Sequence, residues 1–424
     1  MTVKKMLTNA GNDLSKWFSR VLNYNDEVKW VFITVFCSFV HFLLAVVAVF
    51  AAGIYLLVKK KACHLLVQRK NLLTVVFIGL TFVVALWYLS LPGLFGSVFM
   101  FFLITLLFSF RQNVTKRIFE DLLSLFLLYS VPAFLVAFVE RLVGMQSDKL
   151  YRCYSTFSNP LYYAYFITFV VIICTYRIVT TKRDVVLNAI LLIMNVVGMF
   201  YSGSRMPWIG MFAGVMITLV FCRRVKYVVI FAAVIAALLA IAALFPDAKL
   251  LASLRLEDIG AGYSGRLSYW KYALDGFLKR PIFGKGFYGV LNDTMRADDQ
   301  WITRFFSSFD INVIFKTMKQ NGWMLHAHNI LLDSLYNFGV VGTILMAYCI
   351  FDRGLKMYIR LDCDSKNPLF ALMLGVMASI AINGIVDCEI TSPHTAAFSL
   401  LLFAVTELPK TQTVTREKSV LKTE

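Results

Sequence analysis

The sequence predicts an all-α integral membrane protein. Apolar residues make up 59% of the chain and charged residues 16%, whereas soluble domains carry about 45–50% apolar and about 25% charged residues. The apolar residues form blocks of about 17–25 residues, the helix length that crosses roughly 30 Å of hydrocarbon, and only helices satisfy the backbone within such a block. Basic residues gather between the blocks. The net charge of +17 therefore belongs to membrane connections, and nucleic-acid binding is not expected.

The first segment, residues 1–29, is polar and basic, and no cleavable signal peptide is visible in it. Leu14, Trp17 and Phe18 recur there at helical spacing beside Lys16 and Arg20. This pattern is typical of a short interfacial helix on the cytoplasmic membrane surface. A frayed tail is the alternative.

The apolar blocks predict 11 or 12 transmembrane helices, in an N-terminal bundle over residues 30–245 and a C-terminal group over 328–408, with a tail at 409–424. The blocks lie at 30–58, 72–89, 94–110, 118–139, 160–176, 185–201, 206–221, 226–245, 330–351, 368–386 and 395–408. The first block is long for one helix. A turn near Ala51-Ala52-Gly53 would divide it in two and give 12 helices.

Lysine and arginine are concentrated in every second connection between the blocks. The basic connections begin with Lys59-Lys60-Lys61, and the connections at 90–93, 140–159 and 202–205 are poor in basic residues. Basic connections stay in the cytoplasm. This distribution places both termini inside and residues 246–327 outside.

The outside segment 246–327 is far longer than an ordinary loop of about 12–15 residues at most. Apolar residues predict a helix that begins at Ser264 and ends before Pro281, Gly284 and Gly286. Its apolar stripe is Leu267, Trp270, Leu274, Phe277 and Leu278, and a second apolar face follows at Trp301, Phe305, Phe306, Phe309 and Ile314. These amphipathic helices are expected to form a folded lid over the outer mouth of the bundle.

Two arginines are candidates for binding phosphate on the outer side. Arg205 follows the small residues Ser202-Gly203-Ser204 in a tight turn before Pro207, and its guanidinium presents a fork of donors suited to phosphate. Arg266 is expected at the start of the predicted outer helix, where free N–H groups attract anions. The alternatives are an arginine that reaches lipid headgroups and a surface arginine.

Two of the five histidines lie in the stretch His326-Ala327-His328-Asn329. His328 precedes the span at 330–351, and the helix dipole there favours the neutral imidazole, which is the form that a general base needs. A histidine that only caps the helix is the alternative. A metal site is a third reading, with candidate ligands His326, His328, His394, Asp387 and Glu389. No four-ligand spacing is present, so neither a metal nor another cofactor is expected.

The charge pattern of the spans narrows the class of membrane protein. No Asp, Glu, Lys or Arg lies in the middle of a span. Since such charges mark ion or proton routes, their absence argues against an ion-coupled transporter.

The cysteines leave one pairing open. Cys153 and Cys388 are both predicted outside, where a disulfide is permitted, and the sequence does not decide whether they pair.

Three motifs in series resemble the O-antigen ligase and polymerase superfamily. They are Ser202-Gly203-Ser204-Arg205, then Gly265-Arg266 with Trp270, Pro281 and Gly284-x-Gly286, then His328-Asn329 with Gly339-x-x-Gly342-Thr343 after nine intervening residues. The motifs cover roughly residues 185–350, and the first 180 residues match in hydropathy alone.

This resemblance implies a glycosyltransferase-C-like enzyme of the bacterial inner membrane with its active site on the periplasmic side. It implies transfer of O-antigen from undecaprenyl diphosphate, the donor, to lipid A–core, the acceptor, in lipopolysaccharide biosynthesis. Arg205 and Arg266 would bind the diphosphate and His328 would be the base, with Asn329, His326 and Asp387 in support. An O-antigen polymerase with the same donor stays open, as does a flippase or transporter of lipid-linked sugars.

Overall fold

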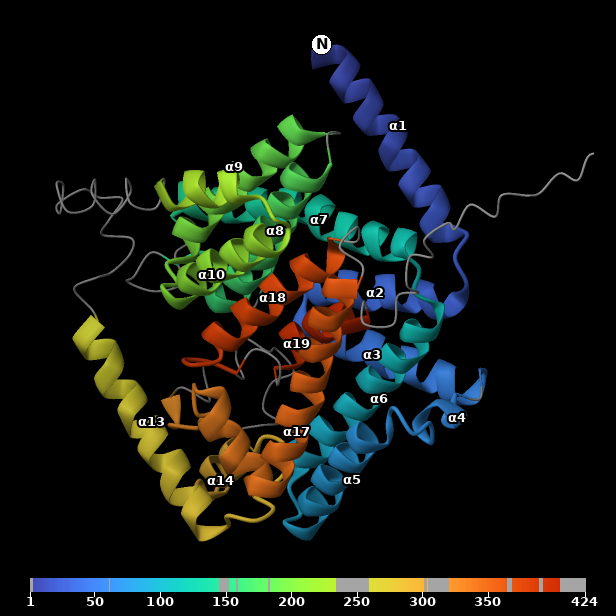
Figure 1. The fold of residues 1–424 in the computed structure, drawn as a ribbon. Helices are drawn as coiled ribbons and strands as arrows, with labels where there is room; N and C mark the ends of the chain where they lie inside the picture. The colour runs from blue at the N-terminus through green and yellow to red at the C-terminus, as the bar shows by residue number, and fades with distance from the viewer. Residues whose placement is uncertain are drawn as a thin grey trace, which may run out of the picture.

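The structure is a computed structural model, and it describes residues 3–60, 62–144, 152–157, 159–181, 184–233, 259–300, 303, 320–363, 368–388 and 392–404. These residues form helices joined by turns and short loops, without a strand among them. The prediction of an all-α fold is therefore confirmed. In Figure 1 the helices pack into one bundle, with α1 projecting from it and α13 lying along one side.

The helices follow the predicted apolar blocks closely. They are α1 (Val3–Leu22), α2 (Asp26–Val40), α3 (Phe42–Val58), α4 (Cys63–Leu66), α5 (Leu72–Trp87), α6 (Leu91–Asn113), α7 (Lys116–Val143), α8 (Pro160–Thr180), α9 (Val185–Ser202), α10 (Met206–Phe221), α13 (Ile259–Lys279), α14 (Gly289–Arg296), α17 (Ile330–Cys363), α18 (Leu369–Asn383) and α19 (Pro393–Leu402). The block at 226–245 and the tail at 409–424 lie partly or wholly outside the described residues.

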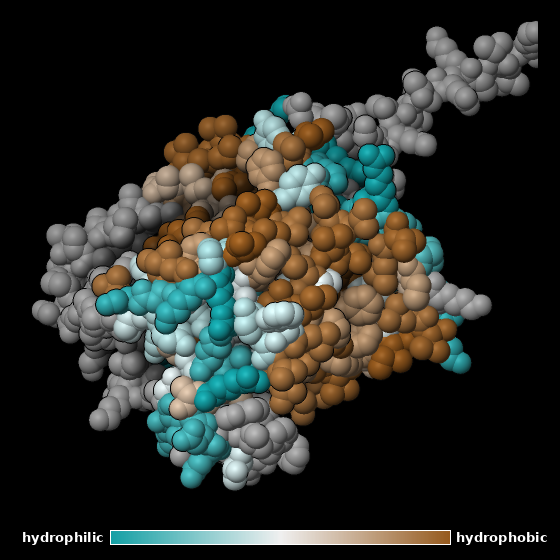
Figure 2. Space-filling model, turned by 90° about the horizontal axis from the view of Figure 1, so that it is seen from below, coloured by the Kyte–Doolittle hydropathy of each residue, from teal (hydrophilic) through white to brown (hydrophobic). Residues whose placement is uncertain are grey.

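The chain is an integral membrane protein. Five of its described helices, α6, α7, α8, α9 and α17, are long and apolar enough to cross a membrane, and four shorter apolar helices accompany them. Large apolar side chains remain exposed around the bundle, such as Val47 on α3, Val83 on α5 and Ile193 on α9. Seen from below, hydrophobic side chains cover a broad part of the surface beside a hydrophilic band (Figure 2). The total of 11 or 12 crossings and the domain boundaries remain predictions.

The first apolar block is divided as predicted, but the predicted turn at Ala51-Ala52-Gly53 is wrong. The break lies at His41, whose backbone is extended and whose Nδ1 accepts from the Leu43 N–H at the start of α3. Gly53 lies inside α3, where any Cβ would collide with the Phe102 ring of α6. The small residues there serve close helix packing, and not a turn.

Helix α8 forms the centre of the bundle, and nearly all of its residues from Tyr162 to Cys174 are buried. On one side, α10 packs against α18 through glycines. A Cβ on Gly375 of α18 would collide with Thr218 and with the backbone of Gly214 on α10. Small residues let two membrane helices approach at backbone distance. This contact fixes the turn that holds Arg205 relative to the end of α18.

Helix α17 is broken at Gly339, where φ is +60° and ψ is −169°. The backbone of Ile282 and Phe283 fills the space that a Cβ of Gly339 would need. Val340 N donates to Pro281 O at 2.7 Å, and Gly286 N donates to Asn337 O at 2.6 Å. The Gly284-x-Gly286 and Gly339-x-x-Gly342 motifs therefore meet, and the loop 281–286 replaces the backbone partners that the kink removes.

Helix α13 differs from its prediction at one end. It ends at Lys279, as predicted, but it begins at Ile259, so Ser264 and Arg266 lie within the helix. Ile259 and Tyr263 continue the apolar spacing of Leu267 toward the N-terminus, which explains the extension. The argument that placed Arg266 at a free helix N-terminus is therefore wrong. The predicted second apolar face, residues 301–314, lies outside the described residues except for Thr303.

The N-terminal segment forms α1, as the interfacial-helix reading expects. Its C-terminal half is fixed to α7, because Trp17 Nε1 donates to Asp121 O at 3.0 Å and Arg20 forms an ion pair with Asp121 at 2.6 Å. Leu14, Phe18 and Leu22 remain exposed beside this contact. The exposed apolar stripe suits the membrane surface.

Candidate active site

The predicted histidine stretch is tied to the turn that follows α18. Asn329 caps α17, since its Oδ1 accepts from the N–H groups of Leu331 and Leu332, both at 3.0 Å. Its Nδ2 donates to Ile385 O at 2.9 Å, and Ile330 N donates to Gly384 O at 2.7 Å. Asn329 is therefore the capping residue, so the imidazole of His328 is not needed for that role.

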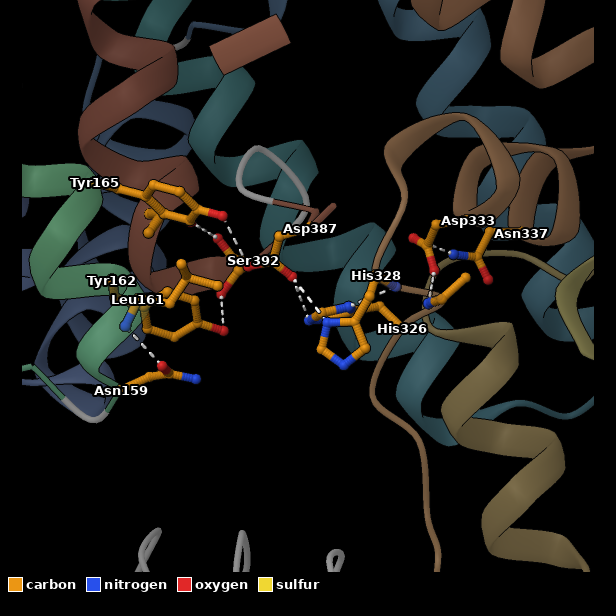
Figure 3. Close-up of polar contacts among 12 residues, drawn as sticks. Asn159, Leu161, Tyr162, Tyr165, His326, His328, Asp333, Asn337, Asp387 and Ser392 are labelled. Atoms are coloured by element: carbon orange, nitrogen blue, oxygen red, sulfur yellow. Dashed lines mark hydrogen bonds and ion pairs between the residues drawn. The ribbon is translucent and has the colours of Figure 1, made fainter. Parts of the chain in front are cut away.

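His328 lies at the centre of the site. Its φ of +52° places it in the left-handed region, which non-glycine residues seldom adopt and which often marks functional sites. Its Nδ1 lies 3.3 Å from Asp387 Oδ1. A carboxylate can only accept, so Nδ1 carries the proton and the lone pair is left on Nε2. This nitrogen points away from Asp387 (Figure 3), and the side chain is 38% exposed.

His326 has the opposite arrangement and a different environment. Its Nδ1 accepts from the backbone N–H of His328 at 3.2 Å, so its Nε2 carries the proton and lies 3.3 Å from Asp387 Oδ1. Burial lowers the pKa of His326 to about 4, against the opposing effect of Asp387. His326 is therefore neutral near pH 7. It contacts Asp387 with a side chain that is largely buried.

Asp387 is the acid that joins the two histidines. Its side chain is 3% exposed, and its Oδ2 accepts from the phenol of Tyr165 at 3.0 Å. Burial opposes its ionisation, but His326 and His328 outweigh burial and hold the pKa of the carboxyl below its ordinary value. A buried carboxylate bonded to Nδ1 fixes the imidazole in the tautomer that frees Nε2, and it stabilises the imidazolium.

Asp333 shapes the loop that carries both histidines. Its Oδ1 accepts from Ala327 N at 3.0 Å, and its Oδ2 accepts from Asn337 Nδ2 at 2.9 Å (Figure 3). Asn337 in turn holds the loop after α13, because its carbonyl accepts from Lys285 and Gly286. Sequence reasoning missed Asp333. Its charge at the start of an apolar span was the signal that could have found it.

Arg266 is placed near His328 by its own helix. Trp270 Nε1 donates to His328 O at 3.3 Å, and the ring of Tyr269 lies 5.4 Å from the His328 ring. Residues three and four positions apart share one face of a helix. Arg266 therefore lies one turn from the two residues that contact His328.

Arg205 begins α10 at the same end of the bundle. Thr168 Oγ1 donates to Pro207 O at 3.4 Å, and Tyr165, one turn earlier on α8, reaches Asp387. Helix α8 thus links the turn of Arg205 to the carboxylate of the site. A second arginine joins this turn, because Arg152 donates to Ser202 O at 3.2 Å and to Ser204 Oγ at 3.0 Å. Sequence reasoning missed Arg152, and no spacing in the sequence pairs it with this turn.

Three of the five metal candidates lie together, and His394 lies apart from them. His326, His328 and Asp387 each offer one ligand atom, and these atoms lie within 4.8 Å of one another. His394 is buried in α19 and stacks on Phe157 at 5.3 Å, and Glu389 lies outside the described residues. Three ligands with a free position would suit catalytic zinc. Hydrogen bonds to Asp387 account for the same geometry.

The two cysteines that were predicted on the outer side occupy separate places. Cys153 and Cys388 do not form a disulfide with each other in the structure. Glu140 lies near Cys153, whereas Asp333 and Asp387 lie near Cys388, and burial raises the pKa of the Cys153 thiol to about 11.

Comparisons with known proteins agree with the sequence motifs. Residues 188–347 match the family model described as O-antigen ligase. A relative, the exopolysaccharide production protein ExoQ of Rhizobium meliloti (strain 1021), is 21% identical over 145 residues, which are 34% of this chain and 31% of the relative. The chain thus spans about a third of the length of that relative. Arg205, Arg266 and His328 all fall within the matched segment, which is similar to the O-antigen ligase family.

Proposed function

We propose that the chain is an O-antigen ligase that transfers polysaccharide from undecaprenyl diphosphate to lipid A–core at the periplasmic face of the bacterial inner membrane. The observation that carries the proposal is the pair of Asp387 and His328, in which a buried carboxylate holds Nδ1–H and leaves Nε2 free on a partly exposed side chain. The family match supports a membrane glycosyltransferase. The donor, the acceptor and the residue roles are part of the proposal.

In this mechanism His328 Nε2 accepts the proton of the acceptor hydroxyl, and the oxygen forms a bond to the anomeric carbon. The bond from that carbon to the diphosphate oxygen breaks, and the diphosphate leaves with the electron pair. Attack opposite the leaving group inverts the anomeric centre. Arg205 and Arg266 stabilise the charge that develops on the diphosphate, and Asp387 stabilises the imidazolium. The diphosphate already activates the donor, so the step needs no ATP and no metal.

An O-antigen polymerase is the second candidate, because the relative from Rhizobium meliloti is named for exopolysaccharide production. A polymerase would use the same donor and the same base, but its acceptor would be another lipid-linked chain. A deletion strain separates the two. Loss of a ligase leaves polymer on the carrier lipid and a bare core, whereas loss of a polymerase leaves a core capped by one unit.

Transfer by purified protein from a defined donor to a defined acceptor tests the proposal. General acid–base catalysis contributes about 10²–10⁴-fold, so His328→Ala is expected to lower kcat by that factor while the protein still inserts and folds. Asp387→Asn is expected to lower kcat by a similar factor, because the amide no longer stabilises the imidazolium. A chelator is expected to leave the rate unchanged.

The matched control is His64→Ala, a substitution of an exposed histidine on α4, which is expected to keep full activity. Normal turnover by a folded His328→Ala protein would contradict the assignment of His328 as the general base. Inhibition by the chelator that added zinc reverses would assign His326, His328 and Asp387 to a metal instead.

A further inference from the structure

A polar cavity of about 340 Å³ lies beside the proposed active site and is not used by the proposed mechanism. Its lining comes from α13, the loop after it, α14 and α17, through Tyr272, Asp275, Gly276, Lys279, Arg280, Lys285, Asp293 and Tyr336. This volume is at the lower end of the range for small-ligand pockets, about 300–1,000 Å³. The loop after α13 and the turn between α5 and α6 face the viewer in Figure 2, where hydrophilic side chains form a band.

Helices α13 and α17 both line the cavity and both contact the loop that carries His328. Trp270 of α13 contacts His328, and the next turns of α13 supply Tyr272, Asp275 and Lys279 to the cavity. On α17, Asp333 and Asn337 hold the histidine loop and the loop after α13, and Tyr336 between them lines the cavity. A ligand in the cavity would therefore lie within a few helical turns of the proposed base.

The basic wall of the cavity contains a donor without a partner. Arg280 Nη1 is buried and has no hydrogen-bond partner among the described residues. Its guanidinium lies over the ring of Tyr88, 4.4 Å from the centroid. A buried unpaired donor is costly, and an anionic oxygen would form a strong, charge-assisted bond with it. Lys279 lies next to Arg280 on the same wall.

The other residues that line the cavity disfavour a small inorganic anion. Lys285 is neutralised by Asp293 at 2.7 Å, and Asp293 also accepts from the phenol of Tyr336. Asp275 adds a carboxylate that repels a dense anion but accepts hydrogen bonds from hydroxyl groups. Tyr272, stacked on Tyr336 with centroids 5.9 Å apart, offers an apolar ring face. Together these groups suit a ligand that carries many hydroxyls and one anionic group.

We propose that this cavity binds a sugar that carries a phosphate or a carboxylate, with Arg280 and Lys279 on the anion and Asp275 on the hydroxyls. The inference rests on the proposed function in one respect, since it takes the sugar from a substrate of that reaction. The anionic sugar belongs either to the polysaccharide of the donor or to the core of the acceptor. In both cases the cavity would fix the saccharide while its reacting end lies at His328.

Calorimetric titration of the full-length protein in detergent with glucose 6-phosphate tests the site without any transfer reaction. The Arg205→Ala/Arg266→Ala background removes the proposed diphosphate site, and in it binding is expected to persist. Arg280→Gln and Lys279→Gln are each expected to weaken binding by about tenfold or more. Lys271→Gln is the matched control, because Lys271 is exposed on α13 outside the cavity lining and the substitution removes the same charge.

The outcomes separate clearly. Absence of binding, or equal affinity in wild type and both cavity variants, would overturn the site. Equal affinity for glucose would overturn the role of the anion, and equal affinity for inorganic phosphate would overturn the role of the sugar. In transfer assays Arg280→Gln is expected to raise KM for the donor or for the acceptor, which identifies the source; unchanged KM for both would overturn the link to the reaction. If the wild-type protein binds glucose 6-phosphate in this cavity but shows no transfer activity, the result would count against the proposed function alone.

Discussion

Burial decides the protonation of His326, and this has a measurable consequence. Because its pKa is lowered to about 4, the unfolded chain binds a proton between pH 6.5 and 4 that the folded protein does not bind. Stability therefore falls as pH decreases through this window, by up to about 1.4 kcal/mol for each pH unit. His326→Gln keeps an amide donor for Asp387 and removes the titration. Melting temperatures in detergent are expected to fall less steeply for the variant between pH 6.5 and 4. Parallel pH profiles for the two proteins would show that His326 is not buried in the neutral form.

The two arginines are expected to act on one ligand, although they are far apart in sequence. Each single Arg→Ala substitution at Arg205 or Arg266 is expected to lower kcat/KM by about 10–100-fold, since hydrogen bonds to charged groups contribute about 1.5–3 kcal/mol. Lysine is expected to restore only part of the rate, because it lacks the planar fork. The double variant is expected to lose less than the product of the single losses if both bind one diphosphate.

Kinetics of the four proteins in this double-mutant cycle supply the measurement, with Lys271→Ala as a control for loss of positive charge on α13. Fully multiplicative losses would place the two guanidinium groups on separate ligands. Full activity of Arg→Lys at both positions would show that charge alone is sufficient.

Single residues also show where sequence reasoning ends. His328 could be singled out because a scarce, titratable residue stood at the start of an apolar span, whereas the capping role of Asn329 appeared only in the structure. Asp387 could be named only as a supporting acid, since its role depends on a turn that hydrogen bonds bring to Asn329 and Ile330. Arg152 could not be found, because its contact with Ser202 and Ser204 arises from packing between distant segments.

At the scale of elements, the kink in α17 is the feature most open to test. Gly339 has positive φ, and the backbone of Ile282 occupies the position of its missing Cβ. Backbone cannot give way as a flexible side chain can, so Gly339→Ala is expected to cost at least about 2 kcal/mol of stability. The loop 281–286 would no longer pack against the kink. Transfer activity is expected to fall as well, because Asn337 links that loop to Asp333, which holds the histidine loop.

The matched control is Gly79→Ala in α5, where a new Cβ meets nothing within 4 Å and alanine favours the helix. Thermal unfolding and limited proteolysis in detergent measure both variants. A Gly339→Ala protein as stable as Gly79→Ala would show that the loop does not dock into the kink.

Helix positions were predictable from apolar blocks, but helix ends were less so. The division of the first block could be predicted from its length. The position of the break at His41 depends on an extended backbone and a side-chain cap, and neither a glycine nor a proline marks that position in the sequence. Ser264 looked like a start signal because a capping residue preceded an apolar stripe. The helix continues through it, since residues on its N-terminal side keep the same spacing. Local signals give way to longer patterns in both cases.

At the scale of the whole molecule, the proposal requires one orientation. The histidine loop, the start of α10, α13 and the polar cavity must all face the periplasm, where lipid-linked polysaccharide and core are expected. The exposed thiol of Cys63 on α4 follows the basic residues Lys59 and Lys60, so it is expected on the cytoplasmic side. Lys271 on α13 is exposed and is expected outside.

Cysteine labelling distinguishes the two sides. In a chain whose other cysteines are replaced by serine, Lys271→Cys is expected to react with a membrane-impermeant maleimide in intact spheroplasts. A chain that retains only Cys63 is expected to react after permeabilisation and not before. Solubilised protein is the control, since both thiols are exposed and should then react. Labelling of Cys63 in intact spheroplasts with protection of Lys271→Cys would place His328 in the cytoplasm. That result would separate the base from a donor whose sugar lies outside, and the transfer proposed for Asp387 and His328 could not occur.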